Sequence, residues 1–235
     1  MSTRYALYVA PAAHSDLWRF GCAILGYDAE TGAETPQLVP PSFAPDAFHA
    51  LTEDPRRYGF HATMKAPFRL AEDASEDALI SELRDFCAAR TALRLPRLEV
   101  RAVGANDAGD AFVALIEPEP TLELLALERD LVIGFDHFRA TLTEAEIARR
   151  RPERLSEGER ENLMRWGYPG VLDHFRFHLT LTGRAPAADV ARLEAELATL
   201  HAAHVPDDGL LVDQIGLFVQ RPGERFVVRE RVLFV

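Results

Sequence analysis

The sequence has few cysteines and no long hydrophobic run. Its 235 residues include two cysteines, Cys22 and Cys87, too few for the disulfide framework of a small secreted protein. Each lies in a stretch with the pattern of an amphipathic helix, so we expect two buried, reduced thiols. No run of eighteen apolar residues offers a membrane span, and residues 1–11 lack the layout of a signal peptide. These absences predict a cytoplasmic protein with no membrane partner.

Several motifs that bind cofactors or carry nucleophiles are also absent. The chain contains no Gly-x-Gly-x-x-Gly, no Walker loop and no Gly-x-Ser-x-Gly, so a nucleotide-cofactor enzyme and a serine hydrolase find no support. The net charge is −11, from 37 acidic and 26 basic residues, which disfavours a protein that grips long nucleic acids. A small anionic substrate is compatible with this charge, because a local cluster of positive residues can oppose the overall field.

What is present is an ordered series of strand and helix patterns. Ser15 and Gly26 are suited to begin and end the first helix. Residues 28–55 are expected to be loop, with one short helix near Asp46. The remaining expected elements of the first half are strands at 4–10, 59–68, 95–103 and 111–116 and helices at 15–26, 75–89 and about 120–133.

The second half repeats this order. Its expected elements are strands at 175–182, 210–220 and 225–235 and a helix at 187–203. Both halves therefore read His-x-Thr strand, helix, strand, strand, and the short turns between the last two strands of each half predict antiparallel pairing. We expect an α+β fold with two pseudo-symmetric lobes of antiparallel sheet flanking a central cleft and helices on the outer faces. The chain 1–235 would be a single bilobal domain, with motif regions at 56–117 and 174–235.

A helical insertion at about 142–170 separates the halves. Two short helices are predicted by capping boxes, formed by Thr143 with Glu146 and by Ser156 with Glu159. The insertion's arginines alternate with nearly as many glutamates, a pattern typical of a solvated, salt-bridged helical pair. The alternative is a lid that brings arginines, Trp166 or Tyr168 over a site.

The phrase Phe-His-x-Thr occurs once in each half, at residues 60–63 and 177–180. Residues two apart on a strand share a face, so each strand presents an imidazole and a hydroxyl opposite an apolar face. One cationic residue continues each polar face. The candidate catalytic and phosphate-binding residues are His61, Thr63, His178 and Thr180, and the candidate substrate-binding cations are Lys65 and Arg176.

Two such faces converging on one cleft could act on a phosphodiester. A neutral imidazole would take a proton from water, and a protonated one would give a proton to the departing oxygen. Histidine titrates near pH 6.5, so we expect both roles to be available near neutral pH without large pKa shifts. The threonine hydroxyls could donate to the non-bridging oxygens. This constellation needs no metal and no cofactor.

The paired His-x-Thr strands resemble the 2H phosphoesterase superfamily. The longer phrases RRYGFHATMKAPF, LSEGERENLMRWGYP and DHFRFHLTLTG resemble one bacterial branch of it, described as phosphonate-metabolism proteins. The resemblance implies that His61 and His178 are the catalytic pair and that Thr63 and Thr180 bind phosphate. It also implies metal-independent opening of a cyclic phosphate, and the gene neighbourhood of the branch hints at a ribose-derived one.

Three hypotheses follow. The leading one is a cyclic phosphodiesterase, a hydrolase acting on a small phosphorylated substrate. The second is a non-catalytic binder of phosphorylated ligands or RNA ends. Processing of RNA 2′,3′-cyclic phosphates is a further alternative to the leading hypothesis. The third is a metal-dependent phosphoesterase that recruits His174 or the Glu-rich insertion, although the strand pattern around His174 disfavours a zinc pair with His178. His201 and His204 are expected at the surface, in the last turn of a helix.

Overall fold

The computed structural model describes residues 2–95, 97–207 and 209–235. The strands are β1 (Arg4–Val9), β2 (Tyr27–Asp28), β3 (Ala33–Glu34), β4 (Ala62–Phe68), β5 (Leu93–Leu95), β6 (Glu99–Val103), β7 (Phe112–Ile116), β8 (His178–Thr180), β9 (Leu210–Val212), β10 (Gln214–Gln220) and β11 (Val227–Leu233). The α-helices are α1 (Asp16–Leu25), α2 (Pro45–Leu51), α3 (Glu53–Arg56), α4 (Glu76–Ala88), α5 (Leu122–Gly134), α6 (Glu144–Arg149), α7 (Glu157–Trp166) and α8 (Ala187–His204). Short 3₁₀ helices are η1 (Asp136–Phe138), η2 (Pro152–Arg154) and η3 (Leu172–His174). Pro96, inside the expected strand 95–103, lies outside the described residues.

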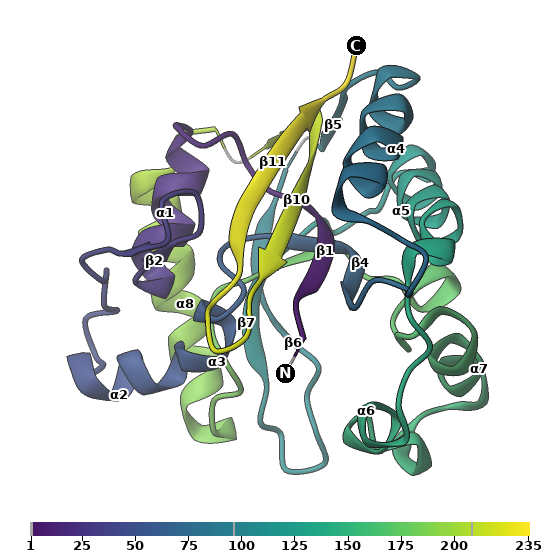
Figure 1. The fold of residues 1–235 in the computed structure, drawn as a ribbon. Helices are drawn as coiled ribbons and strands as arrows, with labels where there is room; N and C mark the ends of the chain where they lie inside the picture. Colours follow the sequence, from purple (N-terminus) through teal and green to yellow (C-terminus); the bar gives the residue numbers. More distant parts are fainter. Residues whose placement is uncertain (1, 96, 208) are drawn as a thin grey trace.

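One large antiparallel sheet passes through the middle of the molecule (Figure 1). Its strand order is β11-β10-β1-β4-β8-β7-β6, and every pairing in it is antiparallel. The predicted α+β class and antiparallel pairing are therefore confirmed. Two separate pseudo-symmetric lobes are not confirmed, because β4 and β8 pair directly and join the two halves of the chain in one sheet.

The strands that follow each His-x-Thr segment change sides. β6 and β7 come from the first half of the chain but extend the sheet beside β8. β10 and β11 come from the second half but extend it beside β1 and β4. A lobe built from each half would not have this order. The helical crossovers after β4 and β8 carry the chain past its own half, so neighbours in sequence are not neighbours in the sheet.

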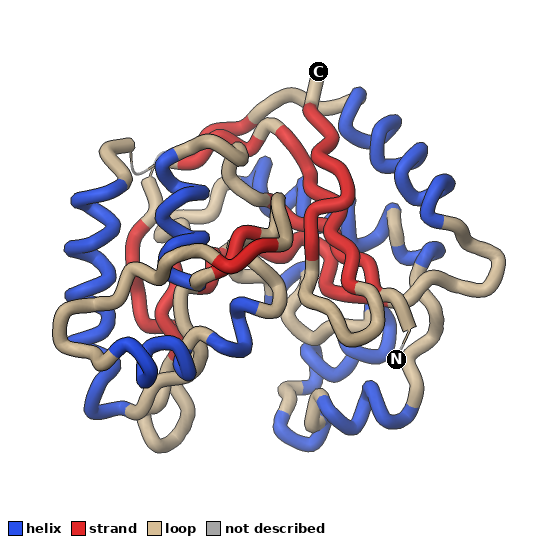
Figure 2. The backbone as a smooth tube through the Cα atoms, turned by 60° about the vertical axis from the view of Figure 1, so that its left-hand side comes forward, coloured by secondary structure: helices blue, strands red, loops and turns tan. Residues whose placement is uncertain are grey.

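The helices pack on both sides of the strands, as the tube in Figure 2 shows. α4 contacts β10 and β11, and α5 contacts β4. On the other side of Figure 1, α8 contacts β6 and β7, with α1 beside it. The insertion helices α6 and α7 lie below α5 in that view and away from the central strands.

Local capping explains where several helices begin and end. The Ser15 hydroxyl accepts from the amide of Trp18 at 3.1 Å, and Gly26 ends α1 with a φ of 72°. Both capping boxes of the insertion are present, at the first residues of α6 and α7. These predictions are confirmed, because a cap depends on residues within one turn of the chain.

Two expectations differ from the structure in detail. Residues 28–55 contain α2 and most of α3, two short helices instead of one. His201 is buried, with its ring edge-on to Phe20 at a centroid distance of 5.4 Å, so its expected surface position is wrong. Cys22 and Cys87 are buried free thiols, as predicted.

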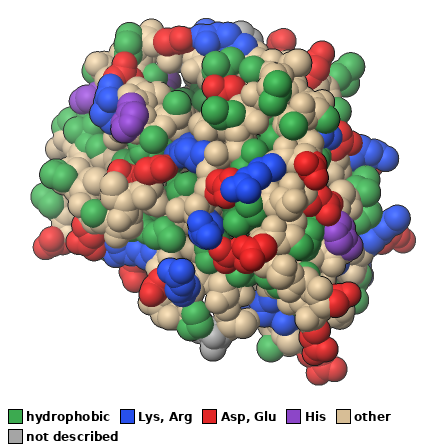
Figure 3. Space-filling view, turned by 45° about the horizontal axis from the view of Figure 1, so that its top comes forward, with side chains coloured by type: hydrophobic (Ala, Val, Ile, Leu, Met, Phe, Trp, Pro, Cys, Tyr) green, Lys and Arg blue, Asp and Glu red, His purple; other side chains and the backbone are tan. Residues whose placement is uncertain are grey.

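The surface mixes charges of both signs. On the face shown in Figure 3, acidic and basic side chains are intermingled with small hydrophobic groups. None of the described helices is long and apolar enough to span a lipid bilayer. Against this mixture of charges, a cleft whose lining has more arginines than acidic residues is a distinct feature of the surface.

Candidate functional site

The two His-x-Thr segments are direct neighbours in the sheet. β4 and β8 run antiparallel with Ala62 opposite Leu179, and each of these residues is the centre of its segment. The pairing is therefore symmetric about this point. The predicted convergence of the two polar faces arises within one sheet and does not require two facing lobes.

This register brings four side chains to one face. His61 lies opposite Thr180, and Thr63 lies opposite His178. Opposite residues of an antiparallel pair have Cβ atoms about 5 Å apart and point to the same side. All four side chains line the same cleft. A ligand in the cleft can therefore meet both imidazoles and both hydroxyls.

Backbone carbonyls orient both imidazole rings. His61 Nδ1 lies 2.9 Å from the Gly59 carbonyl, and His178 Nδ1 lies 2.7 Å from the Arg176 carbonyl. A carbonyl can only accept, so each Nδ1 donates and each Nε2 is the acceptor of a neutral ring. The Thr63 hydroxyl lies 3.2 Å from Nε2 of His61 and donates to it. Among the described residues, Nε2 of His178 has no hydrogen-bond partner.

Gly59 allows the chain to enter this strand. Its φ is 77°, and a Cβ there would lie 2.6 Å from the Cβ of Ala29. Any other residue would strain the backbone and collide with this neighbour. The same residue supplies the carbonyl that orients His61. Gly59 therefore allows the turn into β4 and also fixes which nitrogen of His61 carries the proton.

The cleft holds both histidines in the neutral form. Burial lowers the pKa of His61 to about 3; the hydrogen bond to Gly59 opposes this shift and the nearby His178 adds to it. Burial also lowers the pKa of His178. The expectation that both acid and base roles are available near neutral pH without large pKa shifts is therefore wrong for the free protein.

Replacing His61 with glutamine is expected to make stability less sensitive to acid. The unfolded chain binds a proton here near pH 6.5, whereas the folded protein resists protonation down to about pH 3. Wild-type stability therefore falls as the pH falls between these values, by at most about 1.4 kcal/mol per pH unit for this group. Urea unfolding between about pH 4 and 7 measures the slope. The exposed His14→Gln is the control, and equal slopes in wild type and His61→Gln would contradict the prediction.

Tyr8 forms one wall of the cleft and was not predicted from the sequence. Its ring stacks on His61, with centroids 3.6 Å apart and planes 17° from parallel. The Phe218 ring also packs against Tyr8, at a centroid distance of 4.9 Å. Arg4, Ala6 and Tyr8 are two residues apart along β1 and therefore share one face of the strand. This alternation was the sequence signal that could have placed Tyr8 on the same side as Arg4.

The cleft has a volume of about 370 Å³, within the range of small-molecule sites. Its charged lining residues are three arginines and one aspartate, namely Arg4, Arg150, Arg184 and Asp54. The chain as a whole carries a net charge of −11, so the cleft is a local excess of positive charge. Such a site attracts anionic ligands.

Lys65, a candidate substrate-binding residue, lies on the opposite face. The pairing of β1 with β4 shifts register between Thr63 and Lys65, which places Lys65 opposite Leu7. Its ammonium donates to the Val132 carbonyl at 2.9 Å and to Asp136 at 3.2 Å. The expected shared face is wrong, because an irregularity in a strand turns the side chains that follow it to the other face.

The side chain of Arg176 also lies outside the cleft. Its guanidinium donates to the carbonyls of Phe175 at 2.7 Å and Asp173 at 3.4 Å, and the residue is exposed. Its contribution to the site is the backbone carbonyl that orients His178. The expected position of its charge beside the ligand is therefore corrected.

The insertion contributes to the cleft at one edge. Arg150 and Tyr168 line it, and the Arg150 guanidinium lies over the Tyr168 ring, 4.7 Å from its centroid. Trp166 contacts Arg165 instead. The contact of the insertion with the cleft supports the lid interpretation in part, since an arginine and an aromatic ring do reach the site.

The cleft presents donors that suit a phosphate group and acceptors that suit hydroxyl groups. Threonine hydroxyls and guanidinium groups donate hydrogen bonds to phosphate oxygens. Neutral imidazoles present Nε2 acceptors, which suit the hydroxyl groups of a sugar. In the described part of the chain, no group of three or more His, Cys, Asp or Glu side chains could hold a metal ion.

Comparison with known proteins identifies the relatives of this chain. A family model described as "Protein of unknown function (DUF1045)" matches residues 63–227. A ribose 1,5-bisphosphate phosphokinase PhnN of Janthinobacterium sp. (strain Marseille) is 38% identical over 236 residues, covering 99% of this chain and 51% of that protein. The protein of the same name from Laribacter hongkongensis (strain HLHK9) is 34% identical over 224 residues, covering 92% and 48%. The chain spans about half the length of the curated relatives it matches.

The names of these relatives contradict the predicted reaction and agree with a small phosphorylated ligand. A phosphokinase is a transferase, which contradicts the expected cyclic phosphodiesterase, a hydrolase. The comparisons do not confirm the 2H phosphoesterase resemblance and give no support to RNA ends as ligands. A small phosphorylated substrate agrees with the names of both relatives. Because the family model covers most of the sequence, the chain belongs to the DUF1045 family.

Proposed function

We propose that the cleft beside β4 and β8 binds a small phosphorylated pentose, with ribose 1,5-bisphosphate as the first ligand to test. The observation that carries the proposal is the pairing of two His-x-Thr segments on one face of the sheet, inside an arginine-lined cleft. The names of both curated relatives point to the same ligand class. Their PhnN name also agrees with the phosphonate-metabolism context that the sequence resemblance implies.

The hydrogen-bonding groups of the cleft match this ligand class. The hydroxyl of Thr180 has no protein partner among the described residues and is available to donate to a phosphate oxygen. The Nε2 atom of His178 is an available acceptor for a ribose hydroxyl. Free phosphate would use the donors alone, and a free sugar would leave the cationic groups without a counter-charge. A phosphorylated sugar uses both.

Charge supports the proposal as well. Arginines outnumber acidic residues in the lining, and the cleft is partly shielded from water, so each charge-assisted hydrogen bond to a phosphate contributes about 1.5–3 kcal/mol. Arg184 is fixed by the carbonyls of Gly104 and Asp110. A guanidinium that is already ordered loses less entropy when it binds an anion.

Removing one hydroxyl from the cleft is expected to weaken ligand binding about tenfold. Thr180→Val keeps the shape of the side chain and removes the donor. His178→Phe keeps a flat ring at this position and removes the acceptor. Isothermal titration calorimetry with ribose 1,5-bisphosphate, ribose 5-phosphate and ribose at fixed ionic strength measures the affinities.

Thr199→Val is the matched control, since this hydroxyl lies on α8 and donates to the Ala195 carbonyl. Its affinity should equal that of the wild type. The proposal fails if no phosphorylated pentose binds, or if Thr180→Val and His178→Phe bind as well as the control. Phosphorus NMR of the same samples with Mg-ATP added shows whether the phosphoryl transfer named for the relatives also occurs on this chain.

A further inference from the structure

A second hollow adjoins the cleft. It has a volume of about 190 Å³ and shares Arg4, Tyr58, Pro67 and Arg150 with the cleft. Five arginines and one glutamate are its charged lining residues: Arg4, Arg69, Arg139, Arg149, Arg150 and Glu146. The hollow is thus more cationic than the cleft and continuous with it.

Two of these arginines are already neutralised. Arg69 forms a two-pronged ion pair with Glu146, at 3.2 and 3.0 Å. Arg139 pairs with Asp136 at 2.8 and 3.1 Å. These pairs fix the floor of the hollow to the insertion and to η1. Their charges are satisfied within the protein and need no ligand.

The other three arginines have no carboxylate partner within the described part of the chain. Arg4 donates to the neutral side-chain oxygen of Gln220 and lies over the Phe226 ring. Arg150 lies over an aromatic ring, and Arg149 is exposed. In an acidic protein, three arginines that lie together without a carboxylate partner indicate an anion site.

A buried hydroxyl provides an independent observation. Tyr8 is fully buried, and its Oη has no hydrogen-bond partner among the described residues. Burial raises the pKa of Tyr8 well above its ordinary value, and the charges of Arg4 and Arg150 oppose this shift. A buried hydroxyl without a hydrogen-bond partner costs free energy. A hydrogen bond from this hydroxyl to a bound ligand would remove that cost.

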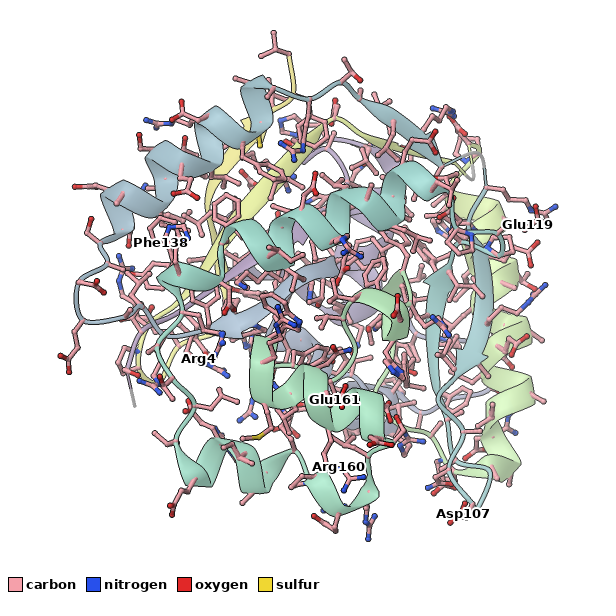
Figure 4. The ribbon with its side chains drawn as sticks, turned by 90° about the vertical axis from the view of Figure 1, so that its right-hand side faces the viewer. Arg4, Asp107, Glu119, Phe138, Arg160 and Glu161 are labelled. Atoms are coloured by element: carbon pink, nitrogen blue, oxygen red, sulfur yellow. The ribbon has the colours of Figure 1, made fainter. Side chains whose placement is uncertain are left out.

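Tyr8 lines the cleft together with Arg4 and Arg150, the two arginines that the hollow shares with the cleft. Its ring stacks on His61. The positive charges of the two shared arginines act on its hydroxyl and lower its pKa against the effect of burial. Figure 4 shows Arg4, the first residue of β1, near the insertion helices, with Arg160 and Glu161 of α7 on the side turned to the viewer. The hollow is lined by the start of β1, the end of β4 and residues of the insertion.

We propose that Arg4, Arg149 and Arg150, with the Tyr8 hydroxyl, form a second phosphate subsite, which makes the ligand of the cleft a pentose bisphosphate and not a monophosphate. This inference rests on the proposed function. The first phosphate lies at the His-x-Thr segments and the second at the arginines, with the pentose between them. Guanidinium groups bind phosphate through paired N–H donors, which lysine could not do at this position.

The test compares which variants weaken which ligand. Calorimetry with ribose 1,5-bisphosphate is expected to show about a tenfold loss of affinity in Arg150→Gln and in Arg4→Gln, and a similar loss in Thr180→Val. Each monophosphate, ribose 1-phosphate or ribose 5-phosphate, should respond to only one of these two groups of variants. Arg160→Gln removes the same charge from the outer face of the insertion and should change nothing.

Tyr8→Phe separates a binding role from a structural one. Removing an unsatisfied buried hydroxyl should keep or raise the melting temperature, while bisphosphate affinity falls severalfold. A purely structural hydroxyl would not lower affinity in a variant of equal or higher stability. Unchanged bisphosphate affinity in Tyr8→Phe would remove this residue from the subsite.

The outcomes distinguish the two proposals. If Thr180→Val weakens the bisphosphate but Arg4→Gln and Arg150→Gln do not, the second subsite is refuted and the proposed function stands. If the wild type binds no phosphorylated pentose but binds inorganic pyrophosphate through these arginines, the proposed function is refuted and the anion subsite stands. Loss of every ligand in both groups of variants, with normal folding, would show one undivided phosphate site and overturn the inference.

Discussion

Asp136→Ala is expected to lower the free energy of unfolding by about 3 kcal/mol, because it leaves a buried ammonium without a counter-charge. Lys65 is the only lysine of the chain, and its side chain is 4% exposed. Burial lowers the pKa of Lys65 to about 8, and Asp136 is the main influence that opposes this shift. Without Asp136, the protein must either bury an unpaired charge or release the proton.

A double-mutant cycle with Lys65→Met tests this explanation by urea unfolding. Methionine has a similar length and no charge, so Lys65→Met alone should cost little, since Asp136 keeps its pair with Arg139. In the Lys65→Met background, Asp136→Ala should lose most of its effect. If the loss is equally large in both backgrounds, the pair with Arg139 carries the stability and the buried lysine does not.

This ion pair matters for the site because of where it lies. Lys65 is two residues beyond Thr63 on β4, and Asp136 also holds Arg139, which donates to the Arg165 carbonyl at the end of α7. The network therefore connects the His-x-Thr strand with the insertion. We expect Asp136→Ala to loosen the hollow beside the cleft as well as to reduce stability.

Gly21→Ala is expected to destabilise the protein by about 3 kcal/mol through overpacking. A Cβ at this position of α1 would lie 2.1 Å from two carbons of the Phe60 ring. Phe60 is fully buried, so its ring has no free space into which it could move. Because Phe60 precedes His61, the displaced ring should also weaken ligand binding. Thermal and urea unfolding measure the first effect and calorimetry the second.

Gly134→Ala is the matched control. This glycine is also helical, at the end of α5, and a Cβ added there would have no described atom within 4 Å. Alanine favours the helix, so the substitution should stabilise the protein by up to about 1 kcal/mol. Destabilisation of the same size in both variants would show that the effect comes from the helix backbone and not from Phe60.

Local features could be read from the sequence with accuracy. The caps at Ser15, Thr143 and Ser156 are present where their residue patterns indicate them, because each depends on hydrogen bonds within one turn. The alternation of the two His-x-Thr segments correctly indicated that histidine and threonine share a face. A period of two is a property of any extended chain and needs no knowledge of its neighbours.

Features that depend on distant pairing were missed or misplaced. The register shift that turns Lys65 away from the cleft arises from its pairing with β1, some sixty residues earlier in the chain. The stacking of Tyr8 on His61 and the burial that lowers the pKa of both histidines have the same origin. No local pattern contains this information, because desolvation depends on everything packed around a group.

The amino-acid sequence alone predicted most of the longer helices and strands, the caps at Ser15, Thr143 and Ser156, and the four side chains that the fold brings to one cleft. The fold decided that β4 and β8 are neighbours in one sheet, that the following strands exchange sides, and that Arg4, Tyr8 and Arg150 complete the cleft. The physical reason is the range of the interactions. Turns, caps and strand faces are settled by contacts a few residues apart, whereas strand order, burial and clustered charge are settled by contacts between segments that meet only when the whole chain has folded.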